Sequence, residues 1–91
     1  MKTIEITLFE KSILECAVSR GYKYIARSKR DDLLVICEKE PTKEEDGDWY
    51  AGLNSNINHL DLFNDKFCFI QCTDEKPYYI PTLLKECEVI K

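Results

Sequence analysis

The apolar and polar positions of the chain follow two different periods, and the first segment has the period of a helix. Over residues 7–20, side chains suited to packing recur every three or four positions. Thr7 and Glu10 have the spacing of a capping box, and Gly21 stands where the end of a helix favours a left-handed backbone. We therefore predict an amphipathic helix over residues 7–20. Its packing stripe consists of Phe9, Ile13, Cys16, Ala17 and Arg20.

The residues before this helix leave two alternatives open. Ile4, Ile6 and Leu8 alternate with polar residues, which fits a short strand. A longer helix that begins near residue 3 fits the same residues.

From residue 22 the period changes to two, which is typical of β-strands. Residues 22–27 alternate between two sets of side chains, and residues 33–37 are almost continuously apolar. We predict that the two segments pair as an antiparallel hairpin through a polar turn. In the first strand, Tyr22 and Tyr24 are expected to face the helix as part of the core. The outward face of that strand would then carry Lys23, Ile25 and Arg27.

The second half of the chain contains shorter elements separated by turns. A third short strand is predicted at the Trp-Tyr pair, with Trp49 in the core and Tyr50 at the surface. Residues 66–72 are predicted to form the last strand, and residues 81–87, which begin with proline, a C-terminal helix. The predicted loops are a charged one at residues 42–48 and a turn-rich one at residues 52–58.

Together these elements predict one small α+β domain over residues 1–91. It consists of an N-terminal helix packed on a three- to four-stranded antiparallel sheet, with a short C-terminal helix. A chain of 91 residues closes a single hydrophobic core, so multidomain enzymes are excluded.

Charged residues are segregated along the chain, although the net charge is only −4. Residues 20–30 carry five basic side chains and no acid, which gives +5. Residues 38–48 carry six acids and two lysines, which gives −4. The acidic balance argues against nucleic-acid binding through bulk positive charge, whereas either segment could serve as a charged docking surface.

The five cysteines are expected to be free thiols that act as small core residues. Their number is odd and no secretory leader is recognised, so we expect the reducing cytoplasm of a cell. No apolar run approaches the roughly 18–20 residues of a membrane span, so no membrane association is expected. His59, Cys68, Cys72 and Cys87 lack the tight spacing of zinc knuckles, so we expect neither a metal nor another cofactor.

The residue types needed for catalysis do not form a motif. The three glycines are isolated, so no glycine-rich loop can hold a phosphate. A Cys–His nucleophilic pair would have to use His59, and no pattern marks an oxyanion site. Paired carboxylates such as Asp46 and Asp48 stand in charged turns, where they are expected to be solvated. We therefore predict that the protein is not an enzyme.

Several segments carry a resemblance to other proteins. They read GYKYIAR from Gly21, EKEP from Glu38, DWY from Asp48 and EKPYYI from Glu75, with FI and LL pairs at residues 69–70 and 83–84. With these segments the chain resembles a loose group of short proteins encoded by phages and prophages of Gram-positive bacteria. The resemblance covers most of the chain from Gly21 onward and rests on framework residues. It implies an accessory protein that acts in the cytoplasm of the bacterial host cell, and it transfers no catalytic residue.

The resemblance and the segregated charge lead to one main hypothesis. The protein would be a non-enzymatic accessory protein that binds a bacterial host protein or nucleoprotein complex and inhibits a host defence system. Its acidic segment would occupy a basic nucleic-acid channel by imitating phosphates. The predicted partner-binding residues are Glu38, Glu40, Glu44, Glu45, Asp46, Asp48 and Tyr50.

Two alternatives remain open at this point. The first is a nucleic-acid-binding module whose basic residues contact phosphates. Its predicted residues are Arg20, Lys23, Arg27, Lys29 and Arg30. The second is an oligomer that sequesters a small ligand in a pocket between subunits. The oligomeric state itself, a homodimer included, is left open by the sequence.

Overall fold

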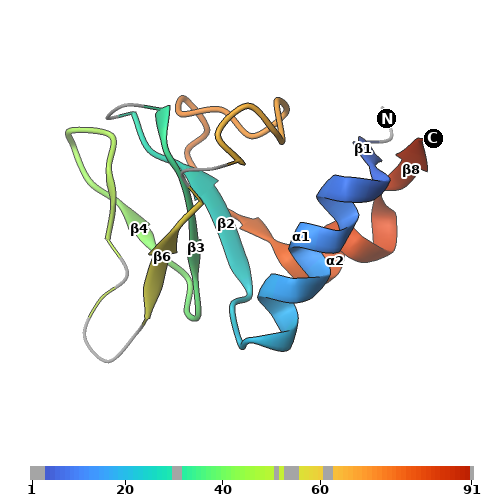
Figure 1. Ribbon diagram of the computed structural model, residues 1–91. Coiled ribbons are helices and arrows are strands. Elements are labelled where there is room, and N and C mark those ends of the chain that lie inside the picture. Colours follow the sequence, from blue (N-terminus) through green and yellow to red (C-terminus); the bar gives the residue numbers. More distant parts are fainter. Residues whose placement is uncertain (1–3, 30–31, 51, 53–55, 61–62, 91) are drawn as a thin grey trace.

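The computed structural model describes residues 4–29, 32–50, 52, 56–60 and 63–90, and these form a mixed α+β fold (Figure 1). The fold class predicted from the sequence is confirmed. The elements in chain order are β1 (Glu5–Thr7), α1 (Leu8–Ser19), β2 (Tyr24–Arg27), β3 (Leu34–Cys37), β4 (Thr42–Lys43), β5 (Trp49–Tyr50), β6 (Ile57–His59), β7 (Tyr78–Tyr79), α2 (Ile80–Glu86) and β8 (Glu88–Ile90).

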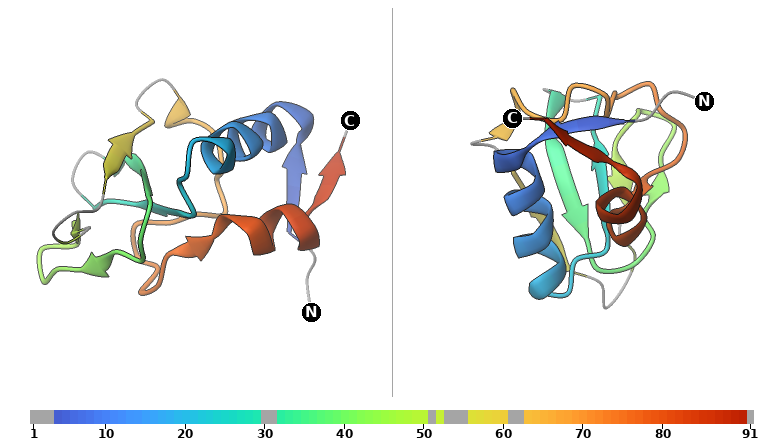
Figure 2. Two further views of the ribbon diagram at one scale, coloured as in Figure 1. Left: turned by 90° about the horizontal axis from the view of Figure 1, so that it is seen from below. Right: turned by 90° about the vertical axis from the view of Figure 1, so that its right-hand side faces the viewer.

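A four-stranded antiparallel sheet in the order β6-β3-β2-β7 forms the middle of the molecule. β2 and β3 pair as the predicted hairpin, with Ile25 opposite Ile36. The two helices lie to one side of the sheet and β4 to the other (Figure 1). β1 and β8 pair in parallel at the far end of the helices, so the first and last strands lie side by side (Figure 2).

Successive side chains of a strand point to opposite faces, and in the β2–β3 hairpin both faces are covered. On the helix side, Ile25, Leu34 and Ile36 join a buried cluster that includes side chains of both helices. On the other side, Trp49 of β5 packs against a smaller cluster. Its members are Ala26, Val35 and Cys37, with Tyr24 packed beside them.

The predicted facing of β2 is wrong for three of its residues. Tyr24 lies on the face that Trp49 of β5 covers, whereas Ile25 and Arg27, predicted to face solvent, are buried at 1% and 5% exposure. Lys23 is exposed and Tyr22 packs against the helix-side cluster, as predicted. The period of two holds within β2, but Tyr22 precedes the strand and lies on the face opposite Tyr24. An inner strand that is covered on both faces does not indicate which face meets water.

The N-terminal helix is confirmed as α1, and local contacts specify both of its ends. Thr7 Oγ1 accepts a hydrogen bond from the Glu10 N–H at 3.1 Å, and Glu10 Oε1 accepts one from the Thr7 N–H at 2.8 Å. At the other end Gly21 adopts a φ of 96° and its N–H bonds to the carbonyl of Val18. The strand alternative is correct for the preceding residues, where β1 pairs with β8. The alternative of a helix from residue 3 is wrong.

The predicted last strand, residues 66–72, is wrong. This segment runs through turns, and Phe67 has a left-handed φ of 57° while its side chain is fully buried. The reason is that side chains replace a strand partner: Glu10 accepts a hydrogen bond from the Phe67 N–H, and Arg27 donates to the carbonyls of Lys66, Phe67 and Ile70.

The shorter elements are partly as predicted. The C-terminal helix is confirmed as α2, and Trp49 is buried while Tyr50 is 54% exposed, as expected. β5 pairs with β4 instead of joining the main sheet, and the outer strands of that sheet are β6, from the predicted turn-rich region, and β7. Of the cysteines, Cys37 is a core residue, whereas Cys16 and Cys68 are exposed, contrary to prediction.

Candidate functional site

The acidic segment forms a two-stranded ribbon, which we define as β4, β5 and the connecting residues 44–48. The backbone of Glu44 bonds to that of Asp48 at 2.8 Å, so the strand ladder continues into the turn. Alternation along both strands separates two faces. Lys43 and Trp49 face the body of the protein. The outer face carries Thr42, Glu44, Asp48 and Tyr50.

The tip of the ribbon is a tight turn with carboxylates on it. The Gly47 N–H bonds to the Glu44 carbonyl at 2.9 Å, and Gly47 has a φ of 91°. A type I turn followed by a left-handed residue is a common three-residue hairpin connection, and glycine suits its last position. Asp46 Oδ1 accepts a hydrogen bond from the Asp48 N–H at 3.0 Å. The turn therefore holds Glu45 and Asp46 at an exposed tip.

The ribbon is anchored to the body through its inner face. Trp49 Nε1 donates a hydrogen bond of 3.0 Å to the Arg27 carbonyl. Lys43 Nζ donates to the carbonyls of Cys72 and Asp74, both at 2.8 Å, and lies 5.8 Å from the centroid of the Trp49 ring. Sequence reasoning counted Lys43 only as a charge. Its alternation with Thr42 and Glu44 was the available signal that it points inward.

The turn also contacts the end of β2. The Lys29 N–H bonds to the Gly47 carbonyl at 3.1 Å, and a Cβ placed on Gly47 would lie 2.6 Å from the Cβ of Lys29. Gly47 is therefore required both by its backbone conformation and by this close approach. The acidic turn is held against the body at its tip as well as at its base.

Two of the predicted acidic residues lie outside the ribbon. Glu38, half-buried at the end of β3, accepts a hydrogen bond from the Asn56 N–H at 3.1 Å. Glu40 is exposed beside Pro41, at the base of the ribbon, in a shallow depression that Lys43 and Trp49 also line. Burial raises the pKa of the Tyr24 phenol, and the charge of Glu40 raises it further.

The predicted basic segment does not form one patch. Arg27 is 5% exposed and donates to five backbone carbonyls at 2.7–3.4 Å, so it cannot reach a phosphate. Lys29 is exposed but lies against the acidic turn, and Arg20 stands at the end of α1. Lys23 is exposed, and Arg30 lies outside the described residues. Sequence spacing could not reveal this dispersal, because the carbonyls around Arg27 come from residues 32–70.

Within the described part of the chain, no group of three or more histidine, cysteine or acidic residues could hold a metal ion. Burial raises the pKa of Cys37 to about 11, so this thiol stays protonated at neutral pH. All buried side-chain nitrogen and oxygen atoms of the described residues have a hydrogen-bond partner.

Neither described helix has the length and apolarity needed to cross a membrane. Comparison with known proteins finds no counterpart, since no family model, curated protein or solved structure matches the chain.

Proposed function

We propose that this protein is a non-enzymatic binding protein that docks on a basic surface of a bacterial macromolecule through its acidic ribbon. The observation that supports the proposal is that the ribbon is anchored. Trp49 and Lys43 fix it to the body by hydrogen bonds of 2.8–3.0 Å, and these contacts leave its outer face and tip exposed. A binding surface that is already ordered loses little conformational entropy when a partner docks.

The outer face has the residue types that such docking requires. Glu44, Glu45 and Asp46 are exposed, and no ion pair neutralises them within the described residues. Tyr50, on the same face as Glu44, is 54% exposed. Exposed carboxylates accelerate association with a basic partner, and a tyrosine is among the residues that most often dominate the binding energy of an interface.

The partner class follows from charge and from the resemblance to phage and prophage proteins. In its specific form, the proposal is that the basic surface belongs to a nucleic-acid-binding protein of a bacterial defence system. The ribbon would then occupy the channel in place of phosphates, and inhibition would follow from competition with nucleic acid.

The experiment compares two variants with the same change in net charge. The ribbon variant is E44K/E45K/D46K, and the control variant E15K/E75K/E86K reverses three exposed acids outside the ribbon. Tagged proteins are used to recover binding partners from bacterial lysate, and each recovered partner is then purified and its affinity measured at two salt concentrations. We expect a partner that binds the wild type and the control but binds the ribbon variant at least tenfold more weakly, with a smaller salt dependence.

The proposal that the ribbon imitates phosphates has its own test. Addition of a DNA or RNA duplex should displace the wild-type protein from the purified partner. Equal affinity of both variants for every partner would contradict docking through the ribbon. Persistence of the complex in excess nucleic acid would contradict the imitation of phosphates while leaving the ribbon as the contact.

A further inference from the structure

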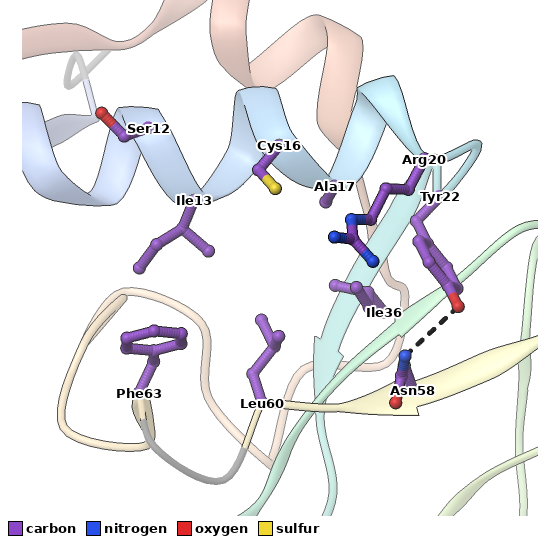
Figure 3. Close-up of a pocket in the computed structure, with 10 residues that line it drawn as sticks. All are labelled: Ser12, Ile13, Cys16, Ala17, Arg20, Tyr22, Ile36, Asn58, Leu60 and Phe63. Carbon is purple, nitrogen blue, oxygen red and sulfur yellow. Dashed lines mark hydrogen bonds between the residues drawn. The ribbon is translucent and has the colours of Figure 1, made fainter.

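A pocket of about 350 Å³ lies between α1 and the segment that contains β6 (Figure 3). One wall is made by side chains of α1, among them Ile13 and Ala17. The opposite wall is made by Leu60 and Phe63, whose side chains point toward the helix, and Ile36 of β3 also lines the pocket. The walls are therefore mostly apolar, and the volume lies within the range of small-molecule sites.

The pocket explains an error of the sequence-based expectation for α1. The stripe predicted to pack in the core includes Ile13, Cys16 and Arg20, and all three line this pocket. Of that stripe only Ala17 is buried, and Ile13 is partly buried against the core cluster. The other buried residues of the helix are Glu10 and Leu14. An apolar stripe at helical spacing is thus left partly uncovered, and its exposure to water is unfavourable.

One end of the pocket is polar. Arg20 extends from the end of α1 with its guanidinium toward the space between the walls (Figure 3), and this guanidinium has no hydrogen-bond or ion-pair partner among the described residues. Beside it, the Tyr22 hydroxyl oxygen accepts a hydrogen bond from Asn58 Nδ2 at 3.3 Å. The phenol hydrogen of Tyr22 has no acceptor within the described part of the chain. The N–H groups of the Arg20 guanidinium and the O–H group of Tyr22 are therefore available as hydrogen-bond donors at this end of the pocket.

We propose that this pocket binds a small amphipathic carboxylate. The guanidinium of Arg20 matches a carboxylate through paired hydrogen bonds, and the Tyr22 hydroxyl can donate a further one. The apolar body of the ligand lies between Ile13 on one wall and Leu60 and Phe63 on the other. At about 30 Å³ for each water-sized group, the pocket holds about a dozen non-hydrogen atoms. This size matches a medium-length acyl chain.

Decanoate, which has this size and chemistry, is a suitable probe, and the thiol of Cys16 is a built-in reporter. Cys16 is exposed and its sulfur points into the pocket (Figure 3), whereas Cys68 is exposed but does not line it. We expect saturating decanoate, kept below its micelle-forming concentration, to slow iodoacetamide alkylation of Cys16 at least fivefold and to leave the rate at Cys68 unchanged. Mass spectrometry of the separate peptides measures both rates. Cys37, which is buried, should remain unmodified throughout and so shows that the protein stays folded.

A pair of substitutions tests the polar end. Arg20→Gln should weaken decanoate binding about tenfold or more, since a hydrogen bond between charged groups is lost. Lys23→Gln, which removes a nearby exposed charge outside the pocket, should leave the affinity within twofold. Decylamine, a cation with the same chain length, should bind the wild-type protein at least tenfold more weakly than decanoate. Isothermal titration calorimetry gives the four affinities, the affinity of the wild-type protein for decanoate included.

The outcomes that would overturn this assignment are specific. They are absence of decanoate binding to the wild type, equal protection of Cys16 and Cys68, equal affinity of the Arg20→Gln and Lys23→Gln variants, or equal affinity for decanoate and decylamine. None of them bears on the acidic ribbon, whose test uses different residues and a macromolecular partner.

Discussion

Replacing Arg27 by methionine should destabilise the protein more than any other change of one basic residue in the described structure. The methionine keeps an unbranched apolar stem of similar reach and removes all donors. Arg27 Nε bonds to the Ile70 carbonyl at 2.7 Å, and its terminal nitrogens bond to four further carbonyls between residues 32 and 67. The substitution therefore leaves a set of backbone acceptors without partners in one step.

The magnitude follows from which of these acceptors can recruit water. The hydrogen bonds to Asp32, Asn64 and Lys66 are only partly buried, so water can replace the guanidinium there. The carbonyls of Phe67 and Ile70 are buried, and each unsatisfied group costs about 1–3 kcal/mol. The two carbonyls together cost about 2–6 kcal/mol, and removal of a buried charge offsets part of this, so we expect a net loss of about 2–4 kcal/mol in the free energy of unfolding.

Urea denaturation followed by circular dichroism measures the effect. Lys23→Met is the matched control, because Lys23 is exposed one residue before the same strand, and it should change stability by less than about 0.5 kcal/mol. Arg27→Lys should fall close to Arg27→Met, because one ammonium cannot reach carbonyls on several sides. A loss of less than about 1 kcal/mol for Arg27→Met, with an unchanged slope of free energy against urea, would refute the reasoning that Arg27 organises the turns after β6.

Two further predictions concern the ribbon and its core. Gly47→Ala should lower the free energy of unfolding by about 2 kcal/mol or more, since it combines a φ of 91° with a Cβ contact of 2.6 Å to Lys29. Gly52→Ala should lower it less, because Gly52 has a φ of 80° but open space around the added Cβ. Thermal unfolding of both variants checks this order. Burial raises the pKa of Cys37 to about 11, so as the pH rises its thiol ionises in the unfolded chain before it ionises in the folded protein. The free energy of unfolding should therefore be unaffected below pH 9 and decline between pH 9 and 11. Cys37→Val should decline less over that window in urea titrations at fixed pH, and an unchanged decline would contradict the assignment.

Local signals made part of the fold predictable. The ends of α1 depend on Thr7, Glu10 and Gly21, which lie within one helical turn of the positions that they cap, and both ends occur where the sequence placed them. The β2–β3 hairpin is similarly local, with a short turn between two strong strand segments. In each case the residues that decide the structure are neighbours in the sequence.

The segment after β6 could not be predicted, because distant side chains decide its structure. Residues 66–72 have the composition of a strand, yet Glu10 bonds to the Phe67 N–H and Arg27 bonds to carbonyls on both sides of it. These contacts span 57 and about 40 residues of sequence. A buried arginine surrounded by carbonyls has no sequence signature, so Arg27 was assigned to a surface patch instead.

The candidate sites were predictable to different degrees for the same reason. The sequence places Trp49 inside and Tyr50 outside and shows residues 42–48 as a charged loop, but it does not indicate that this loop contains β4. The pocket is not visible, since the stripe on α1 looks the same whether another element covers it or not. What leaves Ile13 only partly covered and Cys16 exposed is the position of Leu60 and Phe63, which depends on how β6 pairs with β3.

The ribbon and the pocket lie on opposite faces of β3. In β3, Ile36 lines the pocket, while Val35 and Cys37 pack against Trp49 beneath the ribbon. A ligand and a partner would therefore touch alternate residues of β3 without sharing a side chain. Two sites are coupled only when an element between them has two arrangements and each bound partner favours one of them. β3 is bonded to β6 on one side and β2 on the other, so a shift of its register would expose one of its buried faces. Decanoate should therefore bind the E44K/E45K/D46K variant and the wild type with equal affinity. The E15K/E75K/E86K control measures the effect of three reversed charges alone. A difference in affinity beyond that effect would show that β3 moves as a unit.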